Sequence, residues 1–167
     1  MENNQCSSQG CLGKWISSSI VVFVLLFIMG YLIHHVWLMP IYQQTAALWR
    51  PMGQMQQFFP LMLGYYAGLS VVIAALFCKV SKAKMAACAG EEAECRIGGK
   101  HCPIKYGICF GVLIGLLMGI QSAGAYIWMP IPSELAIDWL IGNVVQGIVI
   151  GVALSLICYF KKKHCAK

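Results

Sequence analysis

Charged residues are scarce in this chain of 167 residues, and acidic residues are the scarcest. Asp, Glu, Lys and Arg make up 11% of the sequence, and only six of its residues are acidic. Soluble domains carry roughly 25% charged residues, so the shortage excludes a water-soluble enzyme, a nucleic-acid-binding domain and a disordered chain. Four windows contain no Asp, Glu, Lys or Arg at all, namely 15–49, 51–78, 106–133 and 139–160.

Each of these windows is longer than the ~20 apolar residues that cross the hydrocarbon core of a bilayer. Their apolar runs are continuous rather than alternating, which excludes the strands of a membrane barrel. A helix also satisfies its own backbone hydrogen bonds in lipid. The sequence therefore predicts an all-α polytopic membrane protein with four transmembrane helices, arranged as two tandem helical hairpins. The predicted helices are 16–38, 58–78, 106–128 and 139–160.

The positive charges give this topology a direction. With four crossings, eleven of the twelve Lys and Arg residues fall on one side, and only Arg50 falls on the other. Positive residues mark the cytoplasmic side of a membrane, so both termini are predicted to be cytoplasmic. The predicted segments are a cytoplasmic N-terminal segment 1–15, a first hairpin 16–78, a Cys-rich cytoplasmic connector 79–105, a second hairpin 106–160 and a basic cytoplasmic tail 161–167.

The predicted outer side has no cysteine, which excludes a dithiol chemistry that needs an outward Cys-x-x-Cys. All nine cysteines fall on the cytoplasmic side or at the cytoplasmic ends of helices, where disulfides are not expected. Weak candidate metal ligands are Cys88, Cys95, Cys102 and His101. Their spacing differs from the paired ligands of structural zinc sites, so reduced thiols and a metal site both stay open. No cofactor is predicted, with haem or a transition metal as an alternative.

The two halves of the chain share a motif, which indicates an internal repeat. Trp49 follows Pro40 by nine residues, and Trp139 follows Pro130 by nine residues. Because both halves enter from the cytoplasm, this is a parallel repeat. Each proline is expected to end a helix. Tryptophans near these prolines are expected to anchor the chain at the outer interface; they are Trp37, Trp49, Trp128 and Trp139.

Small residues form stripes on the predicted third and fourth helices. Glycines at a spacing of four residues allow close van der Waals contact between helices. The sequence does not decide whether these faces pack within one chain or between chains. The glycines are Gly107, Gly111, Gly115, Gly119, Gly147 and Gly151.

Few polar residues lie at membrane depth, and most belong to the predicted outer half. Such residues are costly in lipid and are therefore candidates for function. His34 and His35 are adjacent, so they point about 100° apart and only one can readily face the interior. The group predicts a polar pocket, for which interfacial hydrogen bonding, a proton or small-solute pathway and a metal site are alternatives. Its members are His34, His35, Gln121, Ser122, Asn143 and Gln146. On the outer loops, Arg50 is expected to pair with Glu134 or Asp138.

The sequence contains no phosphate-binding glycine loop, G-x-S-x-G or H-E-x-x-H motif, and its predicted spans hold no carboxylate. We therefore expect no enzymatic activity. The absence of carboxylates also weighs against an ion-coupled transporter.

The order of the apolar motifs resembles a group of small bacterial four-helix membrane proteins known only as a domain of unknown function. The likeness covers roughly 16–160 and carries over no site residue. It implies a bacterial inner (cytoplasmic) membrane location. The motifs are Gly30-Tyr31, Leu38-Met39, Leu63-Gly64-Tyr65-Tyr66-Ala67, Tyr106-Gly107 and the series Gly142, Gly147 and Gly151.

Two functions follow as hypotheses. The first is a non-enzymatic membrane protein, an accessory or structural subunit of a larger membrane complex assembled through its Gly-rich helix faces. The second is a small-solute or metal-ion transporter or binding protein with a polar site in the outer half of the bundle. The expected partners are the lipid bilayer and other membrane subunits or further copies of the chain, with no nucleic acid.

Overall fold

The computed structural model describes residues 9–90 and 103–165, and this part of the chain is almost wholly helical and has no β-strand. Its helices are α1 (Gln9–Tyr31), the π-helical turn η1 (Leu32–Trp37), α2 (Met39–Gln44), η2 (Ala46–Leu48), α3 (Met52–Met55), η3 (Gln56–Phe58), α4 (Phe59–Gly90), α5 (Pro103–Ala123), α6 (Ala125–Trp128) and α7 (Ser133–Cys165). Four segments are long and apolar enough to cross a membrane, namely Trp15–Trp37, Ala46–Ser81, Ile104–Trp128 and Ser133–Cys158. The predicted all-α class is confirmed for the described residues, and so is the presence of four helices that are long and apolar enough to span a membrane.

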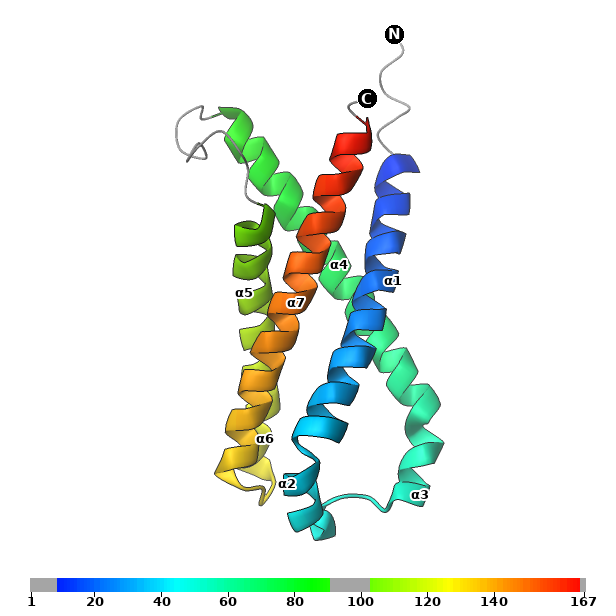
Figure 1. The fold of residues 1–167 in the computed structure, drawn as a ribbon, viewed down its shortest axis with the longest axis vertical. Helices are drawn as coiled ribbons and strands as arrows, with labels where there is room; N and C mark the ends of the chain where they lie inside the picture. Colours follow the sequence, from blue (N-terminus) through cyan, green and yellow to red (C-terminus); the bar gives the residue numbers. More distant parts are fainter. Residues whose placement is uncertain (1–8, 91–102, 166–167) are drawn as a thin grey trace.

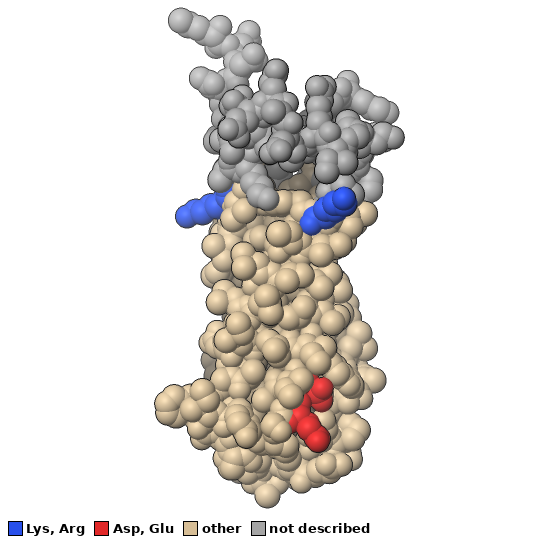
Figure 2. Space-filling model, turned by 90° about the vertical axis from the view of Figure 1, so that its left-hand side faces the viewer, with Lys and Arg blue, Asp and Glu red and all other residues tan. Residues whose placement is uncertain are grey.

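The helices run between two ends of an elongated bundle (Figure 1). The start of α1, the end of α4, the start of α5 and the end of α7 lie together at one end, here named the terminal end. The short elements α2, α3 and α6 lie at the opposite end, here named the loop end. Figure 2 shows basic side chains towards the terminal end and acidic side chains towards the loop end.

Two long helices extend beyond their predicted bounds. Helix α4 continues to Gly90, so the first part of the predicted connector 79–105 is helical. Its residues 82–89 are mostly Lys and Ala, which are strong helix formers. Helix α7 begins at Ser133, directly after Pro132, and ends at Cys165, so it includes most of the predicted tail 161–167.

The core of the bundle draws equally on the four spans. Each span contributes two buried residues four positions apart, which places both side chains on one face of its helix. The pairs are Val22 and Leu26 on α1, Ile73 and Phe77 on α4, Phe110 and Ile114 on α5, and Ile150 and Leu154 on α7. This cluster, here named the central core, closes the middle of the bundle.

Helices α5 and α7 pack against each other through their glycines. A Cβ atom added to Gly111 would lie 2.7 Å from the Cα of Ile148, and one added to Gly107 would lie 2.8 Å from the Cα of Val152. Only glycine leaves room for backbones this close. The glycine faces of α5 and α7 are therefore used within the chain.

Helix α1 packs against both α4 and α7. In Figure 1, α4 crosses behind α1 and α7 and diverges from them towards the loop end. Since α1 has neighbours in both halves of the chain, the grouping into two equivalent hairpins stays a prediction.

The first span changes its helical form before it ends. At the end of η1 the backbone N–H of Leu38, the residue that follows it, donates to the carbonyl of Ile33 at 2.9 Å, a π-type hydrogen bond across five residues. Pro40 then occupies the first turn of α2, where its missing N–H costs nothing. Single π-helical turns are frequent at functional sites, and this one carries His34 and His35.

Candidate functional site

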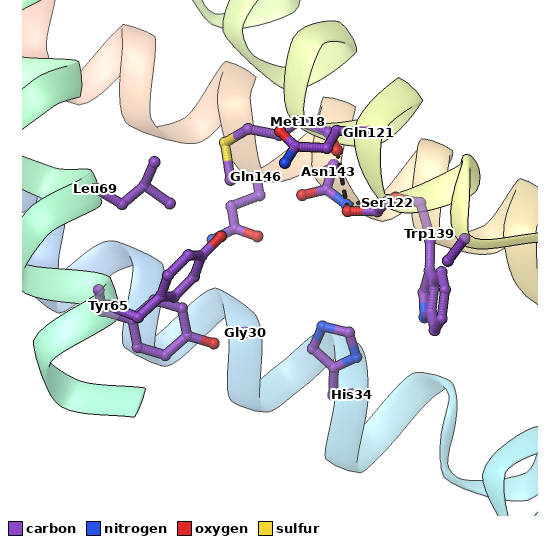
Figure 3. A pocket seen from close by; sticks show the side chains of 12 residues that line it. Gly30, His34, Tyr65, Leu69, Met118, Gln121, Ser122, Trp139, Asn143 and Gln146 are labelled. Carbon is purple, nitrogen blue, oxygen red and sulfur yellow. Dashed lines mark hydrogen bonds between the residues drawn. The ribbon is translucent and has the colours of Figure 1, made fainter. Parts of the chain in front are cut away.

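A cavity of about 300 Å³ opens in the half of the bundle nearer the loop end (Figure 3). All four spans contribute to its wall, each with residues one to three turns beyond its central-core pair. Helix α1 contributes Gly30, α4 contributes Tyr66 and Leu69, α5 contributes Met118, and α7 contributes Gln146. The central core lies on the terminal-end side of these residues, because Leu26, Ile73, Ile114 and Ile150 are each four positions nearer to that end than the closest lining residue of the same helix.

The structure brings most of the predicted polar residues to this one cavity. Its wall includes His34, Gln121, Ser122, Asn143 and Gln146. Their side chains converge in Figure 3 from η1, α5 and α7.

His35 is the one predicted pocket residue that does not line the cavity. Its ring stacks on Tyr31, with the ring centroids 5.2 Å apart and the planes at 29°, and both residues are exposed. The angular separation of neighbouring helix residues allows only one of the two histidines to face inwards, and the structure shows that this is His34.

Several polar groups of the cavity are held by their own or neighbouring helices. The hydroxyl of Ser122 donates to the carbonyl of Met118 at 3.0 Å. The amide nitrogen of Asn143 donates to the carbonyl of Trp139 at 2.8 Å and to the Ser122 hydroxyl at 3.4 Å. The amide nitrogen of Gln146, which is buried, donates to the carbonyl of Leu26 at 3.4 Å. These bonds fix the amide nitrogens and leave the amide oxygens of Asn143 and Gln146 as acceptors.

Other polar groups of the cavity have no partner within the described ranges 9–90 and 103–165. The side-chain amide of Gln121 and the hydroxyl of Tyr66 make no hydrogen bond there. The lining thus offers donors and acceptors without any Asp, Glu, Lys or Arg. Such a wall suits a small polar molecule that carries no net charge.

A chain of hydrogen bonds at the loop end orients His34. The indole N–H of Trp139 donates to the hydroxyl oxygen of Tyr42 at 2.7 Å. The same hydroxyl lies 2.7 Å from Nδ1 of His34. Because an indole can only donate, the Tyr42 hydroxyl accepts from Trp139 and keeps its own hydrogen available for His34 Nδ1, an arrangement that suits the tautomer with its proton on Nε2.

Tyr42 is suited to this role because it stays protonated. Burial raises the pKa of Tyr42, and the hydrogen bond from Trp139 offsets part of that rise. The phenol packs edge-on against Trp49, with ring centroids 5.2 Å apart. Trp49 in turn lies edge-on against Trp139 at 6.2 Å.

The four tryptophans predicted as interfacial anchors divide into two kinds. Trp37 and Trp128 are exposed, the latter to 84%. Trp49 and Trp139 are half-buried and contact each other. Trp139 has a further role that the predicted outer belt does not include, because its indole N–H is used inside the protein and its side chain lines the cavity.

The predicted pairing of Arg50 with Glu134 or Asp138 is wrong. The Arg50 guanidinium lies over the ring of Phe58, 4.5 Å from the ring centroid. This contact is local, because α3 and η3 return the chain past Arg50 before α4 begins.

The weak metal candidates fall mostly beyond the described part of the chain. Cys95, His101 and Cys102 lie outside it, and Cys88 lies near the end of α4. Among the described residues, no three His, Cys, Asp or Glu side chains are grouped closely enough to hold a metal ion. The cavity itself offers one imidazole and the thioether of Met118.

Sequence reasoning missed Tyr42, Tyr65, Tyr66 and Met118 as parts of the site. Tyr65 and Tyr66 carried a usable signal, since a tyrosine hydroxyl in an apolar span needs a polar environment. Tyr42 and Met118 carried none, because their neighbours belong to distant parts of the chain.

Comparison with known proteins adds no identity, since no protein-family model, curated protein or solved structure matches this chain.

Proposed function

We propose that this is an integral membrane protein that binds a small uncharged polar solute in the cavity lined by His34, Gln121 and Asn143. The observation that carries the proposal is the convergence of neutral polar side chains from three elements on one cavity. A polar side chain within a membrane-spanning helix costs free energy, so residues of this kind usually mark a functional site. The unpartnered Gln121 amide is the sharpest case, because it gains no stabilising bond from the described protein.

The chemistry of the wall favours a neutral solute over a metal ion. A transition metal needs several suitable donors in a defined geometry, and the lining supplies one imidazole and one thioether. An ion would face only dipoles in a low-dielectric setting, whereas a neutral molecule exchanges its bonds to water for bonds to amides and hydroxyls.

The central core closes the cavity on the side of the terminal end, which favours binding of a solute over an open channel. The side chains of Leu26, Phe77 and Leu154 are at most 1% exposed. The solute would therefore enter from the loop end.

The proposed orientation places the terminal end in the cytoplasm of a bacterial cell and the loop end outside. The positive-inside rule supports it, because eleven of twelve basic residues belong to the segments at or next to the terminal end.

A second candidate function is an accessory subunit of a larger membrane complex. The glycines of α5 and α7 no longer support it, because they pack against each other. The face of α4 does, since Cβ atoms added to Gly64 or Gly68 would meet nothing within 4 Å. A stable native complex that forms through α4 and is lost on Gly64→Leu would favour this candidate.

The solute proposal is tested by thermal unfolding of the purified protein in detergent. The probes are acetamide, glycerol and uracil, with acetate and ammonium as charged comparisons. A ligand present at 100 times its Kd stabilises the folded state by about 2.7 kcal/mol. We expect at least one uncharged probe to raise the melting temperature of the wild type, and the charged probes to have no such effect.

The variant Gln121→Leu should lose this shift while keeping the melting temperature of the ligand-free protein. Gln56→Leu is the matched control, because Gln56 is exposed and lies outside the cavity. Equal shifts with charged probes, no shift with any uncharged probe, or a full shift in Gln121→Leu would contradict the proposal.

A further inference from the structure

A second hollow lies on the outside of the bundle, between α4 and α5. Its volume is about 360 Å³, and its lining is almost wholly apolar. The wall includes Leu76 and Val80 from α4 and Cys109, Phe110, Leu113 and Leu117 from α5. Leu113 and Leu117 are 67% and 65% exposed, so the groove opens to the surroundings of the protein rather than to its interior.

The groove matches one leaflet of a bilayer in length and position. Along α5 its lining runs from Tyr106 to Leu117, which is roughly 16 Å at 1.5 Å per residue. This is about half of the ~30 Å hydrocarbon thickness. Tyr106 lies in the first turns of α5, so the groove starts at the terminal end and reaches towards the middle of the membrane.

Polar and basic groups lie where the groove meets the terminal end. The hydroxyls of Ser81 and Tyr106 lie 3.3 Å apart and join α4 to α5 at that point. Lys79 directly precedes Val80 of the wall, and Lys105 directly precedes Tyr106. Both lysines are exposed, and a lysine at this depth extends its ammonium group towards the headgroups.

We propose that this groove binds an anionic phospholipid of the leaflet at the terminal end. One acyl chain lies against Leu113 and Leu117, and the headgroup phosphate lies near Lys79 and Lys105. An apolar groove one leaflet long fits an acyl chain, and exposed lysines that directly precede its wall residues Val80 and Tyr106 fit an anion. The site is separate from the polar cavity and does not depend on the proposed solute.

The test is native mass spectrometry of the purified full-length protein with added phosphatidylglycerol or phosphatidylcholine of the same acyl chains. Phosphatidylglycerol is expected to bind more tightly. Each substitution Lys79→Gln or Lys105→Gln should weaken it about five-fold, the loss that corresponds to one basic residue at a charged surface. Both variants should leave phosphatidylcholine binding unchanged. Arg50→Gln is the charge-matched control, because Arg50 lies at the loop end.

The apolar part of the site is tested by filling it. Leu113→Trp should displace both lipids from the groove, whereas Leu61→Trp should not, because Leu61 is similarly exposed, at 70%, and lies outside the groove. Equal affinity for the two lipids, or lysine variants that bind phosphatidylglycerol as the wild type does, would overturn the proposal. So would full phosphatidylglycerol binding by Leu113→Trp.

Discussion

Trp139 of α7 donates a hydrogen bond to Tyr42 of α2 across 97 positions of sequence, with 2.7 Å between the indole nitrogen and the phenol oxygen. The bond joins the two halves of the chain at the loop end. The same phenol oxygen lies 2.7 Å from Nδ1 of His34. Tyr42 therefore engages Nδ1, and Nε2 is the imidazole nitrogen left for the cavity.

The first prediction concerns the Tyr42 hydroxyl, which is the middle member of the hydrogen-bond series Trp139–Tyr42–His34. Tyr42→Phe leaves both the Trp139 N–H and His34 Nδ1 without their partner, which should destabilise the protein by about 1–3 kcal/mol. Thermal unfolding in detergent measures the loss. Tyr126→Phe is the control, because Tyr126 is 52% exposed and should change the melting temperature little. Equal melting temperatures of Tyr42→Phe and the wild type would contradict the hydrogen-bond chain.

The second prediction concerns alkaline pH. Burial raises the pKa of Tyr42 above its ordinary value of 10.0, so the folded state holds the phenol proton more tightly than the unfolded state does. The stability that depends on this proton is complete below pH 10 and falls as the pH rises towards the folded-state pKa. Above pH 10 the wild type should therefore lose stability faster than Tyr42→Phe does. Parallel pH profiles for the two proteins would argue against a buried, proton-donating Tyr42.

The third prediction separates the two adjacent histidines. His34→Phe keeps a ring at the cavity but removes its hydrogen-bonding nitrogens, and it should weaken binding of the uncharged solute about 2–10-fold. His35→Phe should leave the affinity unchanged, because His35 stacks on Tyr31 away from the cavity. Isothermal titration with the solute that stabilises the wild type measures both affinities. A larger loss in His35→Phe than in His34→Phe would show that the inward-facing histidine has been misassigned.

The fourth prediction concerns the contact between α5 and α7. The methyl group of Gly111→Ala would lie 2.7 Å from the Cα of Ile148, so the helix backbones must separate, at a cost of about 1–3 kcal/mol. The melting temperature in detergent should fall accordingly. The matched substitution Gly68→Ala meets nothing within 4 Å and should be neutral or stabilising by up to ~1 kcal/mol, because Ala is the better helix former. A neutral Gly111→Ala would mean that the two backbones do not approach this closely.

Much of the fold follows from the sequence because a bilayer constrains it strongly. Windows without charge predict the four spans, since each must be apolar and must satisfy its own backbone. The helix ends were predicted less well, as α4 shows. Its extension to Gly90 lies outside the apolar windows, where only the helix propensity of Lys and Ala indicates structure.

The polar cavity was predicted in composition but not in geometry. The free-energy cost of placing a polar side chain in lipid identified His34, Gln121 and Asn143 as candidates from sequence alone. Nothing in the sequence indicated that Trp139 would turn inwards to Tyr42, or that His34 rather than His35 would line the wall. Those choices depend on how α2 lies against α7.

The sequence by itself determined that the chain forms four apolar helices, because the solvent around them dictates their composition and length. The tertiary structure alone decided which faces of those helices meet. Glycines predicted as a packing surface for any neighbour pack α5 against α7 of the same chain, because the small-residue faces of these two helices lie opposite each other in antiparallel register. The cavity opens where α4 diverges from that pair towards the loop end, a consequence of crossing angle and side-chain packing between segments far apart in the chain.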